Sequence, residues 1–318
     1  MQEHILDALK TNLAQETSVI PGDVPENEDL TKIIEKLKQQ TLNIMFVGAT
    51  GVGKSSTINA IFNMDVAKVG DRVDPETSTI QKYEIDNIVL WDTPGLGDSP
   101  ENDKRYAAQI VNALKARDAQ GTFLIDEVVV LVDGSSRDLK TTYEVIENII
   151  APFIGDPKRI VVAINQCDMA MKGRGWDHET NEPELSLVNF LSQKAASVHD
   201  RILESTGIDS TPIFYSALHH YNISKLLLSM LTSMPEGKRF LFADALNKES
   251  DIWKKNDTDQ NYNQEIRKTM TGSLTKALDG AAKGAVAGAT VGNLIPVIGP
   301  VVGAAVGAAL GFLGGLID

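Results

Sequence analysis

The chain is poor in cysteine, in basic residues relative to acidic ones, and in signals for export. Cys167 is its only cysteine, so no intramolecular disulfide can form, and a reducing, cytoplasmic setting is expected. Lys and Arg number 30 against 43 Asp and Glu, a net charge of −13, which argues against a surface that coats nucleic acid. Residues 1–5 have no basic stretch followed by an apolar run, so we expect no secretory signal there.

Charge is missing altogether from residues 284–317, and glycine recurs there and just before at intervals of four. This spacing places each glycine set on one face of a helix, where two backbones can approach closely. A proline-containing break at 293–300 separates the two sets and predicts a helical hairpin. The glycines of this zipper are Gly280, Gly284, Gly288 and Gly292, followed by Gly299, Gly303, Gly307, Gly311 and Gly315.

The uncharged hairpin is expected to contact membrane lipid through residues 280–317. Each arm has about 16–18 residues, slightly short of the roughly 20 needed to span a bilayer. A shallow or re-entrant hairpin is therefore as compatible with the sequence as two spanning helices. The alternative is a soluble hairpin that docks on the body of the protein or on another copy of the chain.

Apolar, strand-like runs alternate with helix-like segments between residues 41 and 232. Strands are expected at 42–47, 82–85, 88–91, 127–132, 159–164 and 212–215. Helices are expected at 55–62, 103–117, 139–150, 183–203 and 221–231. Three of the strands are almost continuous Val, Ile and Leu, as in strands buried on both faces. The alternation predicts an α/β fold with a doubly wound, mostly parallel sheet.

The composition divides the chain into four parts. Residues 1–40 carry two apolar stripes at helical spacing and are expected to form an N-terminal helical segment. Residues 41–232 form the α/β domain, 233–272 a polar helical connector, and 273–318 the glycine-rich hairpin.

A glycine-rich loop lies between the first expected strand and the first helix of the α/β domain. Its residues, 48–55, read GATGVGKS and fit the pattern GxxxxGK[ST]. Such a loop wraps backbone N–H groups around the phosphates of a nucleotide. Lys54 would reach the β and γ phosphates, and the Ser55 hydroxyl would coordinate Mg²⁺. The residues expected to contact the nucleotide here are Gly48, Ala49, Thr50, Gly51, Val52, Gly53, Lys54, Ser55 and Ser56.

A second motif, Asp-Thr-Pro-Gly at residues 92–95, follows the strand expected at 88–91. Asp92 is expected to hold Mg²⁺ through a water, and the N–H of Gly95 to meet the γ phosphate. A threonine hydroxyl in the loop before this strand is also expected to coordinate the metal. Thr77 is preferred because it leaves eight residues to Ile85 of the next strand, and Thr79 is the alternative. The candidate catalytic residues are Lys54, Thr77 and Gly95, and the candidate metal ligands are Ser55, Thr77 and Asp92.

Two further segments are expected to contact the base of the nucleotide. Asp168, in Asn-Gln-Cys-Asp after the fifth strand, can accept two hydrogen bonds from N1–H and the 2-amino group of guanine, a pair that adenine cannot donate. Ser-Ala-Leu at 216–218 offers a backbone N–H for guanine O6. His219 and His220 come next; with no further metal ligands beside them, we interpret them as surface histidines. The residues predicted to bind the guanine of GTP or GDP are Asn165, Gln166, Asp168, Ser216, Ala217 and Leu218.

These motifs, with Ser-Ala-Leu as minor support, resemble those of the Era-like branch of the translation-factor-related (TRAFAC) GTPases. The resemblance covers residues 41–232 and implies a P-loop NTPase G domain that hydrolyses GTP to GDP and phosphate with Mg²⁺. Gln166 replaces the lysine of the family's NKxD, which normally braces the base and the phosphate loop, so its loss bears on affinity more than on base identity. Leu96 stands where Ras-like relatives have a glutamine that orients water, and the resemblance implies a catalytic group supplied from elsewhere or by a partner. Slow basal hydrolysis is therefore expected, with Lys54 and Mg²⁺ stabilising the charge.

Three function hypotheses follow. The first is a GTP-dependent switch at the cytoplasmic face of a membrane, anchored by the hairpin. The second is a soluble regulatory GTPase whose hairpin mediates homodimer formation or binds an effector protein. The third, a ribosome-associated GTPase, is less favoured because the sequence offers no basic RNA-binding domain. The expected partners are a guanine nucleotide, membrane lipid, and a second copy or effector protein.

Overall fold

A computed structural model describes residues 40–62, 79–85, 87–97, 99–119, 121–242 and 269. The predicted N-terminal helical segment, the glycine-rich hairpin and Thr77 lie outside these residues.

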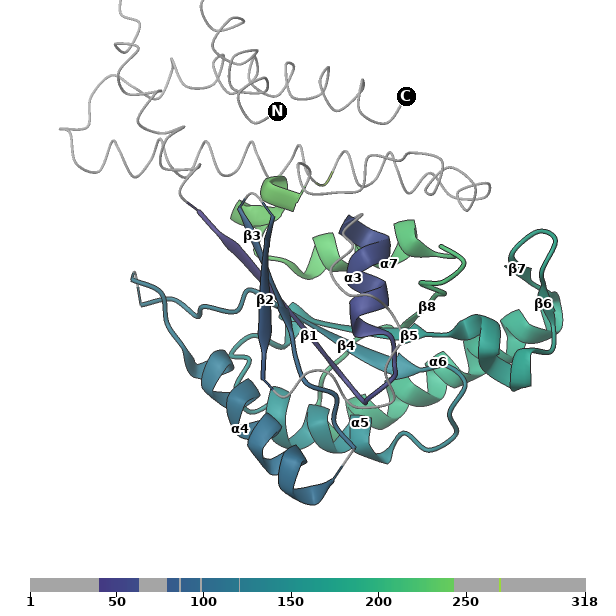
Figure 1. Cartoon of the computed structure of the whole chain (residues 1–318), viewed down its shortest axis with the longest axis horizontal. Coiled ribbons are helices and arrows are strands. Elements are labelled where there is room, and N and C mark those ends of the chain that lie inside the picture. The colour runs from purple at the N-terminus through teal and green to yellow at the C-terminus, as the bar shows by residue number, and fades with distance from the viewer. Residues whose placement is uncertain are drawn as a thin grey trace, which may run out of the picture.

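The described strands of the main sheet run in the order β2-β3-β1-β4-β5-β8 (Figure 1). β2 pairs antiparallel with β3, and every other neighbouring pair is parallel. The predicted α/β fold with a mostly parallel sheet is therefore confirmed. The strands are β1 (Leu42–Gly48), β2 (Gln81–Ile85), β3 (Ile88–Asp92), β4 (Glu127–Asp133), β5 (Ile160–Asn165) and β8 (Ile213–Phe214).

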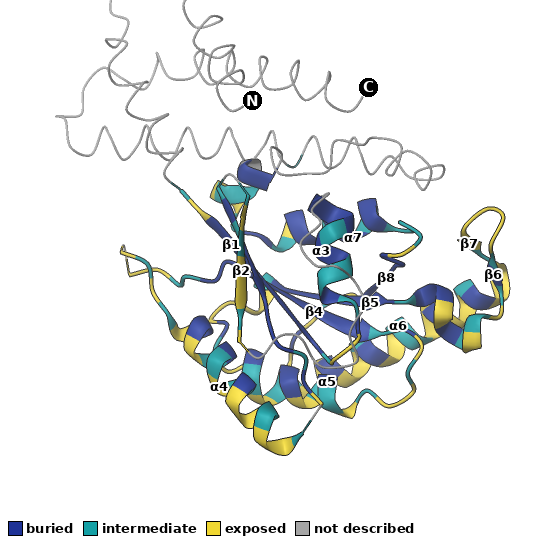
Figure 2. Ribbon diagram, in the orientation of Figure 1, coloured by how far each residue is buried: buried dark blue, intermediate teal, exposed yellow. Residues whose placement is uncertain are grey.

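Helices cover both faces of the sheet. α3 (Lys54–Phe62) and α7 (Ile223–Ser233) pack on one face, and α4 (Pro100–Lys115), α5 (Lys140–Val145), η2 (Ile146–Ile150) and α6 (Leu185–Thr206) pack on the other (Figure 1). Alternate residues of β1 enter the two cores, Phe46 on the α3 side and Val47 on the α4 side. Figure 2 shows the buried strands covered on one face by α4, α5 and α6, whose outer sides are exposed. Because both faces are buried, the central strands read as unbroken apolar runs.

The start of α4 shows how local sequence sets an element's boundary. The Ser99 side chain accepts a hydrogen bond from the Asn102 N–H at 3.3 Å, and Pro100 occupies the first helical position. A hydroxyl cap followed by proline is a strong helix start. The hydroxyl accepts a hydrogen bond from an N–H of the first turn that has no partner within the helix, and proline has no N–H to leave unpaired. The helix therefore begins at Pro100 rather than at residue 103, as its apolar spacing had suggested.

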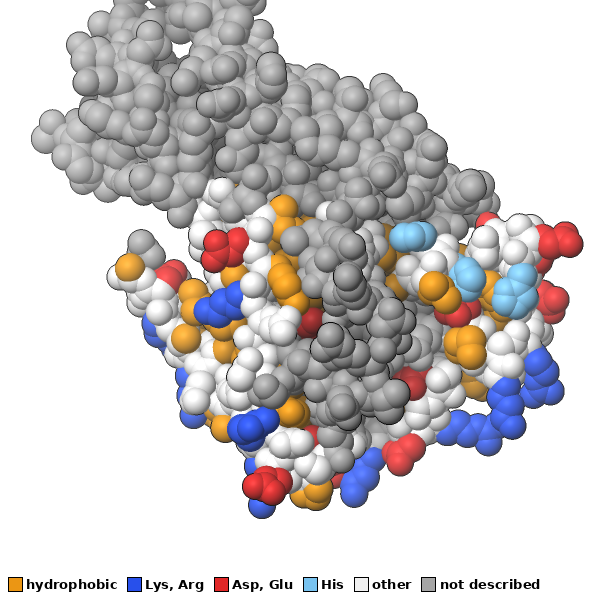
Figure 3. Space-filling view, viewed as in Figure 1, with side chains coloured by type: hydrophobic (Ala, Val, Ile, Leu, Met, Phe, Trp, Pro, Cys, Tyr) orange, Lys and Arg blue, Asp and Glu red, His pale blue; other side chains and the backbone are white. Residues whose placement is uncertain are grey.

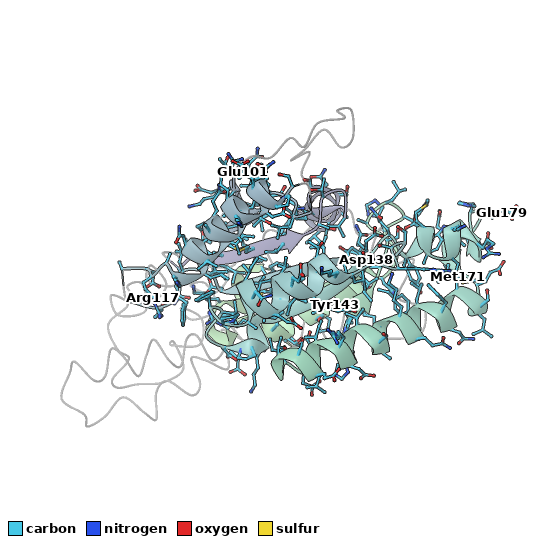
Figure 4. The ribbon with its side chains drawn as sticks, turned by 90° about the horizontal axis from the view of Figure 1, so that it is seen from below. Glu101, Arg117, Asp138, Tyr143, Met171 and Glu179 are labelled. Carbon is cyan, nitrogen blue, oxygen red and sulfur yellow. The ribbon has the colours of Figure 1, made fainter. Side chains whose placement is uncertain are left out.

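A small hairpin of β6 (Trp176–Asp177) and β7 (Glu182–Pro183) lies between η4 (Cys167–Gly173) and α6, and the sequence reading had missed it. Met171 and Lys172 adopt left-handed backbone conformations, with φ of 53° and 62°, that turn the chain into this hairpin. Strands of two residues carry no hydrophobic alternation that a sequence reading could detect. In Figure 4, Met171 and Glu179 lie together at one end of the domain, opposite Arg117.

Packing continues past residue 232 into η5 (Glu236–Leu241), where Leu241 and Phe242 are buried in the α3–α7 core. Phe242 meets the ring of Phe62 edge-on at 5.5 Å. The Lys238 ammonium contacts both oxygens of Asp126 at 2.8 Å, just before β4. These contacts hold η5 at the edge of the sheet where β1 and β4 begin, away from the carboxyl ends of the strands.

Candidate nucleotide-binding site

The glycine loop leaves β1 at the carboxyl edge of the sheet and leads directly into α3, as predicted. Gly51 and Gly53 have φ of 77° and 91°, conformations that favour glycine. A Cβ on Gly53 would lie 2.4 Å from Asn165 Nδ2, so a side chain there would displace the neighbouring loop. With α3 beginning at Lys54, its first N–H groups and helix dipole favour an anion at this end.

Lys54 lies across this loop. Its Nζ donates to the backbone carbonyl oxygens of Gly48 at 3.2 Å and Ala49 at 3.1 Å, and the side chain is buried. The ammonium is thus held at the mouth of the glycine loop, where its charge also acts on Asp92.

Two of the predicted metal ligands are in direct contact. Ser55 Oγ donates to Asp92 Oδ2 at 2.9 Å, and the other carboxylate oxygen, Oδ1, is buried with no hydrogen-bond partner. Burial raises the pKa of Asp92, while the charge of Lys54 and the bond from Ser55 partly oppose that shift. A hydroxyl beside a buried carboxylate is the kind of oxygen donor set that Mg²⁺ prefers, so these residues fit the ion. Thr79, the alternative to Thr77, is exposed.

The Asp-Thr-Pro-Gly segment lies directly against the glycine loop. Leu96 N donates to the carbonyl of Gly48 at 3.3 Å, and Thr50 N donates to the carbonyl of Leu96 at 3.1 Å. A Cβ on Gly95 would lie 2.3 Å from Thr50 Oγ1, which explains the glycine. The Leu96 side chain is 2% exposed and packs in the α4-side core. Its side chain therefore belongs to the protein interior, in keeping with the expectation that Leu96 does not itself orient water.

Asn165 connects three loops of the site. Its Nδ2 donates to the carbonyl of Val52 at 2.9 Å, and its Oδ1 accepts from Ala217 N at 3.1 Å. Gln166 adds a second tie, because its Nε2 donates to the carbonyl of Gly51 at 2.8 Å. The bracing contact to the phosphate loop, expected to be lost with the lysine of NKxD, is thus made by a glutamine amide.

Asp168 is 6% exposed, and its Oδ1 is buried without a hydrogen-bond partner. Its Oδ2 lies 3.8 Å from Nε2 of His219, whose ring stacks on Trp176 with the centroids 5.2 Å apart. His219 is therefore part of the candidate base site, not the plain surface histidine inferred from the sequence. Its position directly after Ser-Ala-Leu was the one signal that pointed there. Figure 3 shows histidine side chains gathered at one end of the described domain, beside acidic and hydrophobic ones.

The remaining predicted residues have different roles. The N–H of Ser216 donates to the carbonyl of Tyr221, so this N–H is already used within its loop. Ala217 is buried, whereas Leu218 is 75% exposed at the rim. Ser56 follows Ser55 in α3 and is half-buried.

Lys194 of α6 was not singled out from the sequence, yet it holds the loop after β4, which contacts Asn165. Its Nζ donates to the carbonyls of Asp133, Gly134 and Ser136 at 2.6–2.9 Å. Gly134 N in turn donates to the carbonyl of Asn165 at 2.7 Å. Burial lowers the pKa of Lys194, partly opposed by the charge of Asp133. In the part of the chain that the structure describes, no three His, Cys, Asp or Glu side chains are grouped to hold a metal.

A strand, a glycine loop and a helix, with a serine–aspartate pair beside them, define a P-loop nucleotide-binding fold. Residues 43–166 match the family model described as "50S ribosome-binding GTPase". This part of the chain is similar to that family of GTPases.

Two curated relatives show the extent of the similarity. The tRNA modification GTPase MnmE of Marinomonas sp. is 25% identical over 178 residues, 55% of this chain and 37% of the relative. GTPase Der of Rickettsia felis is 24% identical over 212 residues, 65% of this chain and 42% of the relative. The chain thus spans about two-fifths of the length of these relatives. Among solved structures, Era of Aquifex aeolicus bound to GDP and AlF4⁻ has a TM-score of 0.40 and 18% identity, over 62% of this chain and 58% of that one.

Proposed function

We propose that the protein is a guanine-nucleotide switch that binds GTP with Mg²⁺ and hydrolyses it slowly to GDP and phosphate. The observation that carries the proposal is the state of Asp168. One oxygen of this buried carboxylate has no hydrogen-bond partner, on a loop that Asn165 and Gln166 tie to the phosphate loop. Leaving a buried acceptor unsatisfied costs roughly 1–3 kcal/mol, and the N1–H and 2-amino groups of guanine would satisfy it.

The rest of the site supports the same proposal. Ser55 and Asp92 would hold Mg²⁺, which neutralises charge on the phosphates when bound. Lys54 would exchange its two carbonyl partners for the β and γ phosphates, since an ammonium pairs more strongly with anionic oxygens than with neutral ones. The Gly95 N–H would meet the γ phosphate, and Thr77 would close on the metal. Order in the 70–80 and 92–103 loops would then report the nucleotide state.

Base specificity is the sharpest test. The full-length chain should bind GDP well, and IDP, which lacks the 2-amino donor, about tenfold or more weakly. Asp168→Asn should shift the preference from guanosine toward xanthosine nucleotides. The matched control is Asp200→Asn, which removes an exposed carboxylate on α6 and should leave the GDP-to-XDP ratio unchanged. An Asp168→Asn protein that binds GDP as the wild type does would disprove the assignment.

We further propose that the chain associates with the cytoplasmic face of a membrane through residues 280–317. The support is the 34-residue stretch without charge, 284–317, and its glycine spacing. Among the residues that the structure describes, no helix is both long and apolar enough to cross a bilayer. The soluble alternative keeps the GTPase and assigns the hairpin to self-association or to an effector protein.

Liposome flotation distinguishes the two. The full-length chain should float with vesicles, and a variant with Val301→Lys and Val306→Lys inside the uncharged stretch should not. Leu185→Lys on α6, the same kind of change at an exposed position of the G domain, should float like the wild type. If the wild type stays unbound with GTP, with GDP and without nucleotide, the soluble alternative replaces the membrane proposal.

The family description favours a ribosome-associated GTPase as a second candidate function. Co-sedimentation of the full-length chain with large ribosomal subunits tests it directly. Binding that requires a non-hydrolysable GTP analogue would support this candidate, and equal sedimentation with and without subunits would remove it.

A further inference from the structure

The carboxylate proposed to read guanine has two oxygens in different surroundings. Oδ1 of Asp168 is buried and has no hydrogen-bond partner, whereas Oδ2 lies 3.8 Å from Nε2 of His219. A carboxylate that can rotate about its Cβ–Cγ bond would present either oxygen to the base. A group that engages Oδ2 and leaves Oδ1 open would favour one orientation.

Two contacts hold His219 in place. Its backbone N–H donates to Ser216 Oγ at 3.2 Å, and Ser216 and Tyr221 pair through both backbone hydrogen bonds at 3.1 Å, which closes the turn around His219. The imidazole lies against the buried Trp176, with the rings tilted by 36° and their centroids 5.2 Å apart. Trp176 is itself fixed by the edge-on ring of Tyr221 at 5.6 Å.

Trp176 belongs to β6, so the β6–β7 hairpin contributes a side chain to the surroundings of Asp168 and His219. It supplies the aromatic surface against which the imidazole of His219 lies. The imidazole of His219, whose side chain is 23% exposed, lies between Trp176 and Asp168. Nε2 and Oδ2 are 3.8 Å apart, about 0.3 Å beyond hydrogen-bond distance, so the proposed bond requires the two side chains to approach.

We propose that His219 is a positioning residue for guanine recognition: it donates from Nε2 to Asp168 Oδ2 and so orients Oδ1 toward the base. This rests on the proposed guanine-reading role of Asp168. Tight discrimination of guanine would then depend on a side chain outside the recognised motifs.

Two substitutions of His219 in the full-length chain separate hydrogen bonding from packing. His219→Phe keeps a ring that can stack on Trp176 but has no donor; His219→Gln keeps an N–H donor at a similar reach but has no ring. We expect His219→Phe to weaken GDP binding about tenfold and to reduce the GDP-to-IDP affinity ratio. His219→Gln should stay within about threefold of the wild type. A loss in His219→Gln equal to or greater than that in His219→Phe would overturn the proposal.

Two comparisons complete the experiment. His178→Phe changes a neighbouring histidine, whose ring centroid is 6.4 Å from that of His219, and should bind GDP as the wild type does. Thermal unfolding of each variant shows that the fold is retained. If Asp168→Asn also leaves the base preference unchanged, the guanine assignment itself fails. If Asp168→Asn switches preference and the two His219 variants are alike, only the role of His219 fails.

Discussion

Gln166 Nε2 donates a hydrogen bond to the backbone carbonyl oxygen of Gly51 at 2.8 Å, and this bond joins the loop after β5 to the glycine loop. Gln166 has a left-handed backbone conformation, φ 58°, that projects its side chain toward Gly51. The neutral amide makes this contact without adding a positive charge beside the glycine loop. The departure from the family pattern therefore keeps the mechanical link between the two loops.

We expect Gln166→Ala to weaken GTP and GDP binding by up to about tenfold, because it removes one of the two side-chain ties between the loop after β5 and the glycine loop. Gln166→Lys should bind at least as tightly as the wild type. Gln193→Ala, an exposed glutamine on α6, is the matched control and should have no effect. Isothermal titration with GDP and Mg²⁺ measures all three. Wild-type affinity in Gln166→Ala would show that the brace does not contribute.

Asp92→Asn should make the nucleotide-free protein more stable and its nucleotide binding independent of Mg²⁺. Burial raises the pKa of Asp92 above its ordinary value, so the ionised form present at neutral pH costs stability in the folded state. Removing the charge should raise Tm by about 2 °C in EDTA. Thermal shifts with GDP, with and without Mg²⁺, test the second part. A variant that still gains stability from Mg²⁺ as the wild type does would contradict the ligand assignment.

Glu127, at the start of β4, predicts a pH dependence of stability. Its side chain is fully buried, and burial raises its pKa well above 4.5, although a hydrogen bond from Ser233 opposes the shift. A raised pKa in the folded state means that the folded protein binds the proton more tightly. The associated stability is present below about pH 4.5 and is lost as pH rises through the folded-state pKa.

The isosteric variant Glu127→Gln should therefore be more stable than the wild type at pH 7–8, with the difference shrinking as pH falls toward 4.5. Denaturant unfolding at several pH values measures it. Glu204→Gln removes an exposed carboxylate on α6 and should show no such trend. A constant difference between Glu127→Gln and wild type across the pH range would rule out this titration.

Leu96→Gln should destabilise the protein without raising its turnover. The Leu96 side chain is buried in the α4-side core, where a glutamine amide would lose water without gaining partners, at a cost of about 2–3 kcal/mol. Leu96→Met, which conserves volume and polarity, should cost less than about 1.5 kcal/mol. Thermal unfolding and single-turnover GTP hydrolysis test both variants. A glutamine variant with native Tm and faster hydrolysis would show that this side chain turns toward the nucleotide.

Much of the fold could be read from residue patterns, because each pattern has a local physical cause. Val128 and Val161 lie in runs that are apolar on both faces, which only strands inside a helix-covered sheet require. The glycine loop was recognisable because its spacing and its place between strand and helix are both short-range properties. The β6–β7 hairpin was missed, since it depends on left-handed residues and two-residue strands rather than on periodicity.

By itself, the sequence determined which side chains the site has available: a glycine-rich loop with Lys54 and Ser55, and the aspartates for which it predicted Mg²⁺ and guanine contacts. Only the tertiary structure decided how these side chains act on one another. It turned Leu96 into the core, connected Gln166 to Gly51 at 2.8 Å, and placed His219 at 3.8 Å from Asp168. Residue types and short spacings determine which reactions a side chain can perform, whereas contacts between residues about 50 to 115 positions apart exist only once parallel strands bring their carboxyl ends to one edge.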